Sequence, residues 1–471
     1  MLRISQIKRN AEKGEQGLKH AAAKELRIRE EEIQNLRICK RSLDARKKPE
    51  LYYVYTVDVE VNDEEKILRR CKSNKVTRAK EVIYAPEQSG TIPFKHRPVV
   101  IGMGPAGLFC ALSLARTGFA PILLERGMDV DRRQEMVETF WQTGQLDERS
   151  NIQFGEGGAG TFSDGKLNTA VKDATGRNTF VLKTFVEFGA PEEILWLNKP
   201  HIGTDLLRKV IKNIRKEILR LGGDVRFEAQ VTDFEIQKGQ LRALIINGAE
   251  RLECEAAVLA IGHSARDTFA LLKKRQFSMS PKAFAVGVRM EHPQHLIDQL
   301  QYHNPKGRGE YLPAAEYSFV AQVNGRGVYS FCMCPGGFVV PAASGPNQIV
   351  VNGMSPSNRG SVWANSGMVV EIRPEDIDQY SRYGVLSGIK FQEELEYQCY
   401  VNGNCKQTAP AQRMTDFVNK KVSFDLPKSS YTPGVISSPL HFWMPEFITS
   451  RLREGFSYFG KISKGFLTRE A

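Results

Sequence analysis

The pattern of apolar residues is clearest between residues 98 and 126. The short apolar run at 99–101 is typical of a buried strand of a parallel sheet. Residues 105–117 then place apolar side chains at helical spacing, and 120–124 form a second apolar run. Strand, helix and strand in this order predict a βαβ unit, and with it a parallel α/β sheet.

Ahead of this unit, residues 1–96 predict a small α+β domain. Strands are expected at 2–7 and 51–61, a helix at 15–26, and either a second strand or the end of a helix at 33–38. The polar, basic stretch 42–48 predicts a loop between them, and residues 87–98, with their Ser-Gly pair and two prolines, predict a linker.

Beyond the βαβ unit, the pattern predicts that residues 97–279 form one domain. Helices are expected at 129–144 and 202–221, strands at 225–227, 231–236 and 241–246 as an inserted meander, and a buried strand at 256–261. Residues 280–430 are rich in strand and turn patterns and predict a mainly antiparallel sheet that faces a substrate. Residues 431–471 predict a partly helical segment with apolar anchors at Phe442, Trp443, Phe447, Leu452, Phe456 and Phe459.

Composition fits a soluble globular protein, since 41% of the 471 residues are hydrophobic and 25% are charged. The first ten residues have no apolar run, so we expect no signal peptide. No stretch approaches the roughly 20 apolar residues of a membrane span. We therefore expect a cytoplasmic protein without a membrane partner.

The net charge of +12 is concentrated near the N-terminus, because residues 1–96 hold 22 Lys and Arg against 15 Asp and Glu. Two interpretations stay open. One is an ordinary solvated basic surface, and the other is a docking surface for an acidic partner such as RNA. The eight cysteines include no CxxC pair, so we expect neither a metal site nor a disulfide framework.

The chemistry predicted for the βαβ unit is dinucleotide binding. Gly102 allows the tight turn, Gly104 lets the backbone approach a diphosphate, and Gly107 lets the helix pack closely on the sheet. The helix N-terminus presents free N–H groups and a positive dipole to phosphates. Glu125 follows Gly107 by 18 residues and ends the next strand, where a carboxylate can accept both ribose hydroxyls.

Five glycines between residues 155 and 165 predict a second ligand-facing loop, because such a run destabilises both helix and strand. Phe154 and Phe162 would anchor it. Cys332 and Cys334 could form a redox pair, but they fall in a run expected to be a regular alternating strand, where packed structural cysteines are the commoner case. His201 and His263 are candidate proton donors, although structural roles are the commoner use of such histidines.

Several long motifs resemble one family. They are IGMGPAGLFCALSLAR, SNIQFGEGGAGTFSDGKLNT, KPHIGTD, VLAIGHSARDTF, FAVGVRMEHPQ and GVYSFCMCPGGFVV. Together they resemble the uncharacterised bacterial FAD-dependent oxidoreductases, or dehydrogenases, over nearly the whole chain. The resemblance implies an α/β fold: a Rossmann-like FAD/NAD(P)-binding domain, an inserted substrate domain and an N-terminal α+β domain. It implies hydride or electron transfer to or from an unknown small molecule.

The resemblance also assigns residues to the cofactor. The diphosphate would lie on Gly102, Gly104, Ala106 and Gly107, the adenosine ribose on Glu125 with Arg126 beside it, the adenine against backbone of Val231, and the rest of FAD along Gly157, Gly158 and Gly262. It assigns no catalytic residue. No separate nicotinamide-nucleotide fingerprint is present, so NAD(P)H as reductant would use a transient site.

Members of this family continue into a further glycine-rich segment that closes over the flavin. That segment is not found before Ala471, and we expect weak flavin retention for this reason. Two other hypotheses stay open beside the oxidoreductase. One is a flavoprotein that binds RNA through residues 1–96, and the other is a cofactor-poor scaffold.

Overall fold

The computed structural model describes residues 1–71, 73–86, 90–169 and 171–471. Contacts divide the chain into two compact units. The first holds Met1–Glu87, Lys166–Ile202 and His295–Ala315, and the second holds Gln88–Gly165, Gly203–Gln294 and Glu316–Ala471. The expected linker at 87–98 begins with residues 87–89, which lie outside the described residues. The four-part division at 96/97, 279/280 and 430/431 stays a prediction.

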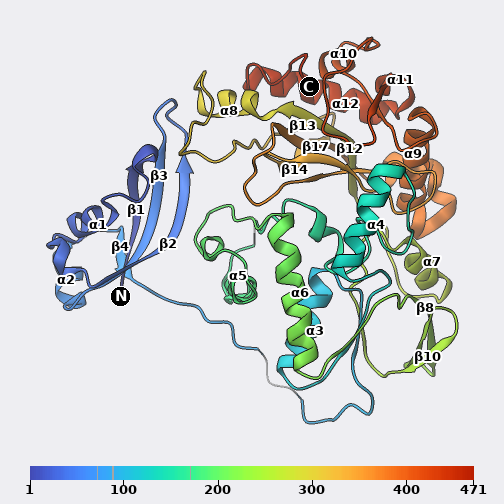
Figure 1. Ribbon diagram of the computed structural model, residues 1–471, viewed down its shortest axis with the longest axis horizontal. Coiled ribbons are helices and arrows are strands. Elements are labelled where there is room, and N and C mark those ends of the chain that lie inside the picture. The colour runs from blue at the N-terminus through green and yellow to red at the C-terminus, as the bar shows by residue number, and fades with distance from the viewer. Residues whose placement is uncertain (72, 87–89, 170) are drawn as a thin grey trace. The chain divides into compact units, whose positions relative to one another are not determined.

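The first unit contains an antiparallel sheet in the order β2-β3-β1-β4. Its strands are β1 (Leu2–Asn10), β2 (Asn35–Asp44), β3 (Tyr52–Glu60) and β4 (Val76–Arg78). Its helices are α1 (Leu18–Leu26), α2 (Glu64–Cys71), α5 (Arg177–Glu187), most of α8 (Gln294–Tyr302) and the short turns η1 (Ala11–Lys13), η2 (Glu30–Glu32) and η4 (Glu192–Leu195). Helices α1 and α2 cover one face of the sheet (Figure 1), where Leu2, Ile4, Leu26 and Tyr55 are fully buried.

The expected loop at 42–48 is wrong at its start. Ser42, Leu43 and Asp44 continue strand β2 and pair with β3, Leu43 lying opposite Tyr53. The polar residues are tolerated because β2 is an edge strand and their side chains are only half-buried. Asp44 also pairs with Lys8, 3.0 Å away, and with Arg46, 2.8 Å away.

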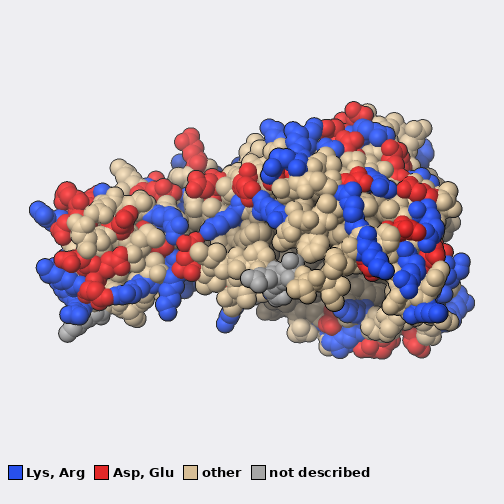
Figure 2. Space-filling model, turned by 90° about the horizontal axis from the view of Figure 1, so that it is seen from below, with Lys and Arg blue, Asp and Glu red and all other residues tan. Residues whose placement is uncertain are grey.

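The surplus of positive charge near the N-terminus is spread among acidic groups. Asp58 accepts hydrogen bonds from Arg3 and Arg37, just as Asp44 binds Lys8 and Arg46. On the face in Figure 2, Lys and Arg alternate with Asp and Glu over the N-terminal strands and helices at the left. RNA binding by this region stays a prediction.

The second unit contains the predicted parallel sheet, in the order β11-β5-β6-β7. Its strands are β5 (Val99–Ile101), β6 (Ile122–Leu124), β7 (Asp224–Arg226) and β11 (Ala257–Leu259). Around them lie α3 (Pro105–Arg116), α4 (Val130–Thr143), α6 (Thr204–Arg220), α7 (Arg266–Lys274) and the short η3 (Gly158–Phe162). Helices α3 and α6 pack side by side (Figure 1).

Two strand expectations need correction. Residues 225–227 were expected in the inserted meander, but β7 joins the parallel sheet beside β6, and the meander is β8 (Val231–Gln237), β9 (Gln240–Ile246) and β10 (Glu250–Glu253). The strand expected to be buried at 256–261 is the edge strand β11, where Val258 and Leu259 are about 40% exposed. A short apolar run reveals a strand but not its position in a sheet.

An antiparallel sheet in the order β12-β17-β14-β13 confirms the expected strand-rich region. Its strands are β12 (Phe284–Pro293), β13 (Val320–Val323), β14 (Arg326–Cys334) and β17 (Trp363–Ile372), and the shorter pairs are β15 (Phe338–Pro341) with β16 (Val351–Met354) and β18 (Ala409–Ala411) with β19 (Val435–Ser437). The helices of this region are η5 (Pro374–Leu386), α9 (Ser387–Asn402), α10 (Met414–Val418), α11 (Leu440–Trp443) and α12 (Glu446–Ile462).

Helix α12 packs against this sheet (Figure 1). Leu452, Phe456 and Phe459 are buried there as expected, whereas Phe442 is 83% exposed and anchors nothing. Among the described residues, no helix has both the length and the apolar character needed to cross a membrane.

The end of the chain is fixed to the sheet by a buried histidine. His292 lies on β12, its Nε2 is 3.0 Å from the carbonyl oxygen of Phe466, and its ring stacks on Phe466 with centroids 4.7 Å apart. Among the described residues no partner reaches Nδ1. Burial therefore lowers the pKa of His292 to about 4, and the ring stays neutral in the folded protein at neutral pH.

This pKa predicts an acid-sensitive contribution to stability. Because the folded pKa lies below the unfolded value of about 6.5, the unfolded chain binds a proton that the folded chain excludes. Stability should therefore fall by about 3 kcal/mol as the pH drops from 6.5 towards 4. The free energy of unfolding can be measured with urea at about pH 7 and about pH 4. Its decrease between these pH values should be about 3 kcal/mol larger in the wild type than in His292→Phe. Equal losses in both proteins would contradict the assignment.

Candidate dinucleotide site

The turn between β5 and α3 uses its three glycines in two ways. A Cβ on Gly102, whose φ is +98°, would lie 2.5 Å from the carbonyl oxygen of Ala260, and one on Gly107 would lie 1.9 Å from that of Gly102. Packing within the chain thus requires both glycines. Gly104 has an ordinary φ of −72°, and a Cβ there would meet nothing nearer than 3.9 Å. The fold therefore does not require glycine at position 104. A ligand that approaches the backbone closely at this point would require it.

Helix α3 begins directly after Gly104 and presents its amino end to a cavity. No side chain caps this end, and Pro105 occupies the first turn. The amides of Ala106 and Gly107 therefore have no intrahelical acceptor, and the helix dipole adds a positive potential. The adjoining cavity has a volume of about 460 Å³. An anion is the natural ligand for this arrangement.

The structure brings together eight of the ten residues that the sequence assigned to the cofactor. Gly102, Gly104, Ala106, Glu125, Arg126, Gly158, Val231 and Gly262 all line this cavity. The other two support its wall from behind. Gly107 packs on the turn, and the amide of Gly157 donates to the carbonyl of Met103 at 2.8 Å.

Glu125 has a larger structural task than the sequence suggested. Its buried carboxylate accepts hydrogen bonds from the amides of Met103 at 2.8 Å, Gly127 at 2.9 Å and Gly155 at 2.9 Å. An ionised carboxylate has about four acceptor positions. Three of these positions are in use, which leaves one for a ligand at the edge of the cavity. The expected contact with both ribose hydroxyls stays a prediction.

Arg126 forms a flat wall of the same cavity. Its guanidinium lies 4.4 Å from the ring centroid of Phe154. It donates to both carboxylate oxygens of Asp267 at 3.1 Å and to the Thr268 hydroxyl at 3.2 Å. These contacts hold a planar cation against an aromatic ring, which is a surface on which a planar base can stack.

The glycine-rich loop lies directly against the first turn. A Cβ on Gly158 would come within 2.9 Å of the Cα of Gly104, so the two backbones touch. Phe154 and Phe162 are buried and anchor the loop as expected. The carboxylate of Glu156 accepts from the amide of Val130 at 2.7 Å and lies 2.9 Å from Arg215, while burial raises its pKa.

The loop is held from behind by Arg133, a role that the sequence reading missed. Its fully buried guanidinium donates to the carbonyls of Asn151 at 2.8 Å, Ile152 at 2.8 Å and Glu156 at 2.6 Å. Burial lowers its pKa to about 10. A signal was present, because Arg133 shares the apolar stripe of α4 with Val130, Val137 and Phe140 at spacings of three, four and seven residues.

Cys332 and Cys334 do not follow the alternation expected of them. A bulge interrupts the register of β14 between Phe331 and Cys334, and Cys332 has a φ of +46°. Residues two apart on a regular strand point to the same face, and the bulge at this position removes that regularity. Cys334 is buried, and Arg289 donates to its sulfur at 3.3 Å.

A second cavity, of about 730 Å³, adjoins the first. His263 lines both cavities, whereas His201 belongs to the other compact unit. Of the two candidate proton donors, His263 alone borders the candidate site.

Arg133 offers a direct test of how the loop is held. Arg133→Met should destabilise the protein by about 3–5 kcal/mol, because it removes a hydrogen bond from each of three carbonyls and the charge that faces Glu125 and Glu156. The neighbouring Arg132, whose side chain is 51% exposed, pairs with Glu228 and serves as the control. Arg132→Met should cost about 1 kcal/mol or less. Urea unfolding compares the two variants, and similar losses would contradict the role of Arg133.

Comparison with known proteins identifies the chain's relatives. Residues 283–471 match a family model described as "FAD-dependent protein, C-terminal domain-like", and residues 1–60 match a domain of unknown function. An uncharacterised protein of Clostridium beijerinckii is 44% identical over 474 aligned residues, which cover 100% of this chain and 88% of that protein.

More distant relatives were also found. The FAD-dependent monooxygenase nodY2 of Hypoxylon pulicicidum is 29% identical over 192 residues, which cover 38% of this chain and 40% of that protein. The crystal structure of THI4 from Thermovibrio ammonificans aligns over 40% of this chain and 66% of that one, with 18% identity and a TM-score of 0.27. One relative matches along the whole chain, and the C-terminal region matches a family model of FAD-dependent proteins. The protein therefore belongs to a bacterial family of FAD-dependent proteins, as its motifs predicted.

Proposed function

We propose that the protein is an FAD-dependent oxidoreductase that binds the cofactor's diphosphate in the 460 Å³ cavity at the amino end of α3. One observation carries the proposal. Gly104 is unconstrained by its own backbone and by neighbouring atoms, yet it stands where a cofactor phosphate would approach, facing the glycine loop at Gly158. The residues present therefore fit a dinucleotide, because they leave a cradle that side chains would fill.

Each wall of the cavity has a proposed part in binding. The amides of Ala106 and Gly107 would donate to the diphosphate, and the remaining acceptor position of Glu125 would take a ribose hydroxyl. Arg126 on Phe154 would stack against the adenine, beside the backbone of Val231. Gly262 would let the chain pass close to the cofactor, since a Cβ there would meet nothing within 4 Å.

Bound FAD would supply hydride or single-electron transfer, while the protein orients it and limits access to it. We propose an unidentified small molecule as the substrate. His263, at the junction of the two cavities, is the candidate to carry a proton to or from it. NAD(P)H as a transient reductant stays part of the proposal, whereas no contact described above favours RNA as a partner.

The substitution Gly104→Ala tests the proposal because the fold itself tolerates it. The added methyl group should occupy the space of a phosphate and weaken FAD binding about tenfold or more. The matched control is Gly90→Ala, where an added Cβ also meets nothing described within 4 Å and the residue is not part of the cavity lining. Titration of flavin-free protein with FAD, followed by flavin fluorescence, gives both affinities.

The stability of the flavin-free variants distinguishes a local effect from misfolding. Both variants should unfold at the wild-type temperature when flavin is absent, since neither methyl group meets an obstacle. If Gly104→Ala bound FAD as tightly as the wild type did, the assigned cavity would be wrong. If the wild type bound no FAD, the cofactor-poor scaffold would be the better description.

A further inference from the structure

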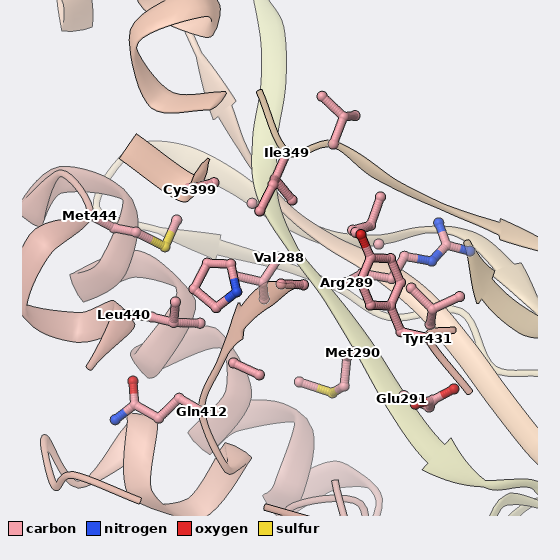
Figure 3. A pocket seen from close by; sticks show the side chains of 18 of the residues that line it. Val288, Arg289, Met290, Glu291, Ile349, Cys399, Gln412, Tyr431, Leu440 and Met444 are labelled. Carbon is pink, nitrogen blue, oxygen red and sulfur yellow. The ribbon is translucent and has the colours of Figure 1, made fainter. Parts of the chain in front are cut away.

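The larger cavity has the size and walls of a small-molecule site. Its volume is about 730 Å³, within the usual range of roughly 300–1,000 Å³ for such sites. Figure 3 shows apolar side chains from separate segments around it, among them Val288, Met290, Ile349, Leu440 and Met444. These walls would bury the apolar body of a ligand.

Most of the polar groups in the wall already have partners within the chain. Glu396 forms an ion pair with Arg266 at 2.7 Å. Gln412 donates to the carbonyl of Lys421 at 2.6 Å, and the Tyr431 hydroxyl donates to that of Gln407 at 2.9 Å. These groups therefore shape the cavity but have little capacity left to hold a ligand.

Arg289 differs from them because part of its guanidinium is unused. Its Nε donates to Asn365 at 2.8 Å, and its Nη2 donates to the carbonyl of Cys332 at 2.9 Å. Across the part of the chain that the structure describes, Nη1 makes neither a hydrogen bond nor an ion pair. The nearby carboxylate of Glu291 instead accepts the amide of Ser430 at 3.1 Å.

The backbone around Arg289 leaves room for the guanidinium. A Cβ on Gly353 would lie 1.8 Å from Nη2, and one on Gly367 would lie 3.9 Å from Nη1. The fork is thus held in one orientation by three acceptors, which are the Asn365 side chain, the Cys332 carbonyl and the Cys334 sulfur, and the two glycines leave room for it. Such a fixed planar cation is well suited to bind a carboxylate or a similar oxyanion.

We propose that the 730 Å³ cavity binds an apolar organic anion, with its anionic group on Arg289 and its apolar body among Val339, Val351 and Val369, which line the cavity on the face of the sheet that Arg289 occupies. Lys428, also in the lining, adds positive potential. His263 borders both cavities, so this ligand would lie next to the cofactor site. Only the identification of this anion as the oxidoreductase's substrate rests on the proposed function.

A matched pair of fluorescent probes tests the proposal on the full chain. Anilinonaphthalene sulfonate is an apolar anion, and phenylnaphthylamine is the same aromatic frame without the sulfonate. The wild type should bind the anionic probe more tightly. Arg289→Met should weaken the anionic probe about tenfold or more and leave the neutral probe unchanged, because one charge-assisted contact is lost while the apolar walls remain.

Two further variants locate the effect. Arg289→Lys keeps the positive charge but loses the planar fork. Its affinity for the anionic probe should therefore lie between those of the wild type and Arg289→Met. Val351→Trp should fill the cavity beside Arg289 and weaken both probes. Equal binding of the two probes by the wild type, an equal loss of both in Arg289→Met, or unaltered binding of both in Val351→Trp would overturn the proposal.

Flavin content separates this proposal from the proposed function. It is measured on the same samples by releasing the flavin and recording its absorbance. Retained flavin without a preference for the anionic probe would reject the cavity assignment alone. A preference for the anionic probe without any flavin would leave the anion site standing and reject the oxidoreductase. If Arg289→Met does not fold, two measurements still test the anion site. They are the preference of the wild type for the anionic probe and the reduction of that preference in Arg289→Lys.

Discussion

Two buried charges of opposite sign hold the backbone on which the candidate site depends. The carboxylate of Glu125 accepts hydrogen bonds from backbone amides in the turn after β5, at the end of β6 and in the glycine-rich loop. The guanidinium of Arg133 donates hydrogen bonds to three backbone carbonyls of the neighbouring loop. Apart from the short η3, the described part of this glycine-rich loop forms no regular helix or strand, and these two side chains satisfy backbone polar groups that such structure would otherwise satisfy.

The same pair explains how so many glycines can form a defined wall. An isolated buried charge is strongly unfavourable, but each of these charges lies in the field of the other and makes three hydrogen bonds to backbone. The loop can therefore approach Gly104 closely through Gly158 without collapsing into the cavity. Rigid backbone at close range is what recognition of a diphosphate requires.

The two cavities of the second unit differ in chemistry. The smaller is lined by backbone and small residues next to a helix end, which suits phosphates and sugars. The larger is lined mainly by apolar side chains around one incompletely used guanidinium. Because His263 borders both, a group bound in one would lie beside a group bound in the other.

Residue spacing along the chain was enough to predict the βαβ unit, the helices α3, α4 and α6, the strand-rich region and eight residues that line the dinucleotide cavity. These features rest on local spacing, since three glycines and an acid at fixed intervals are typical of this unit. Four features became visible only in the folded chain: β7 joins the parallel sheet, β11 lies at its edge, Arg133 holds the glycine loop, and a bulge at Cys332 interrupts β14. Each of these depends on which distant segment supplies the hydrogen-bond partner, and sequence spacing carries no record of that choice.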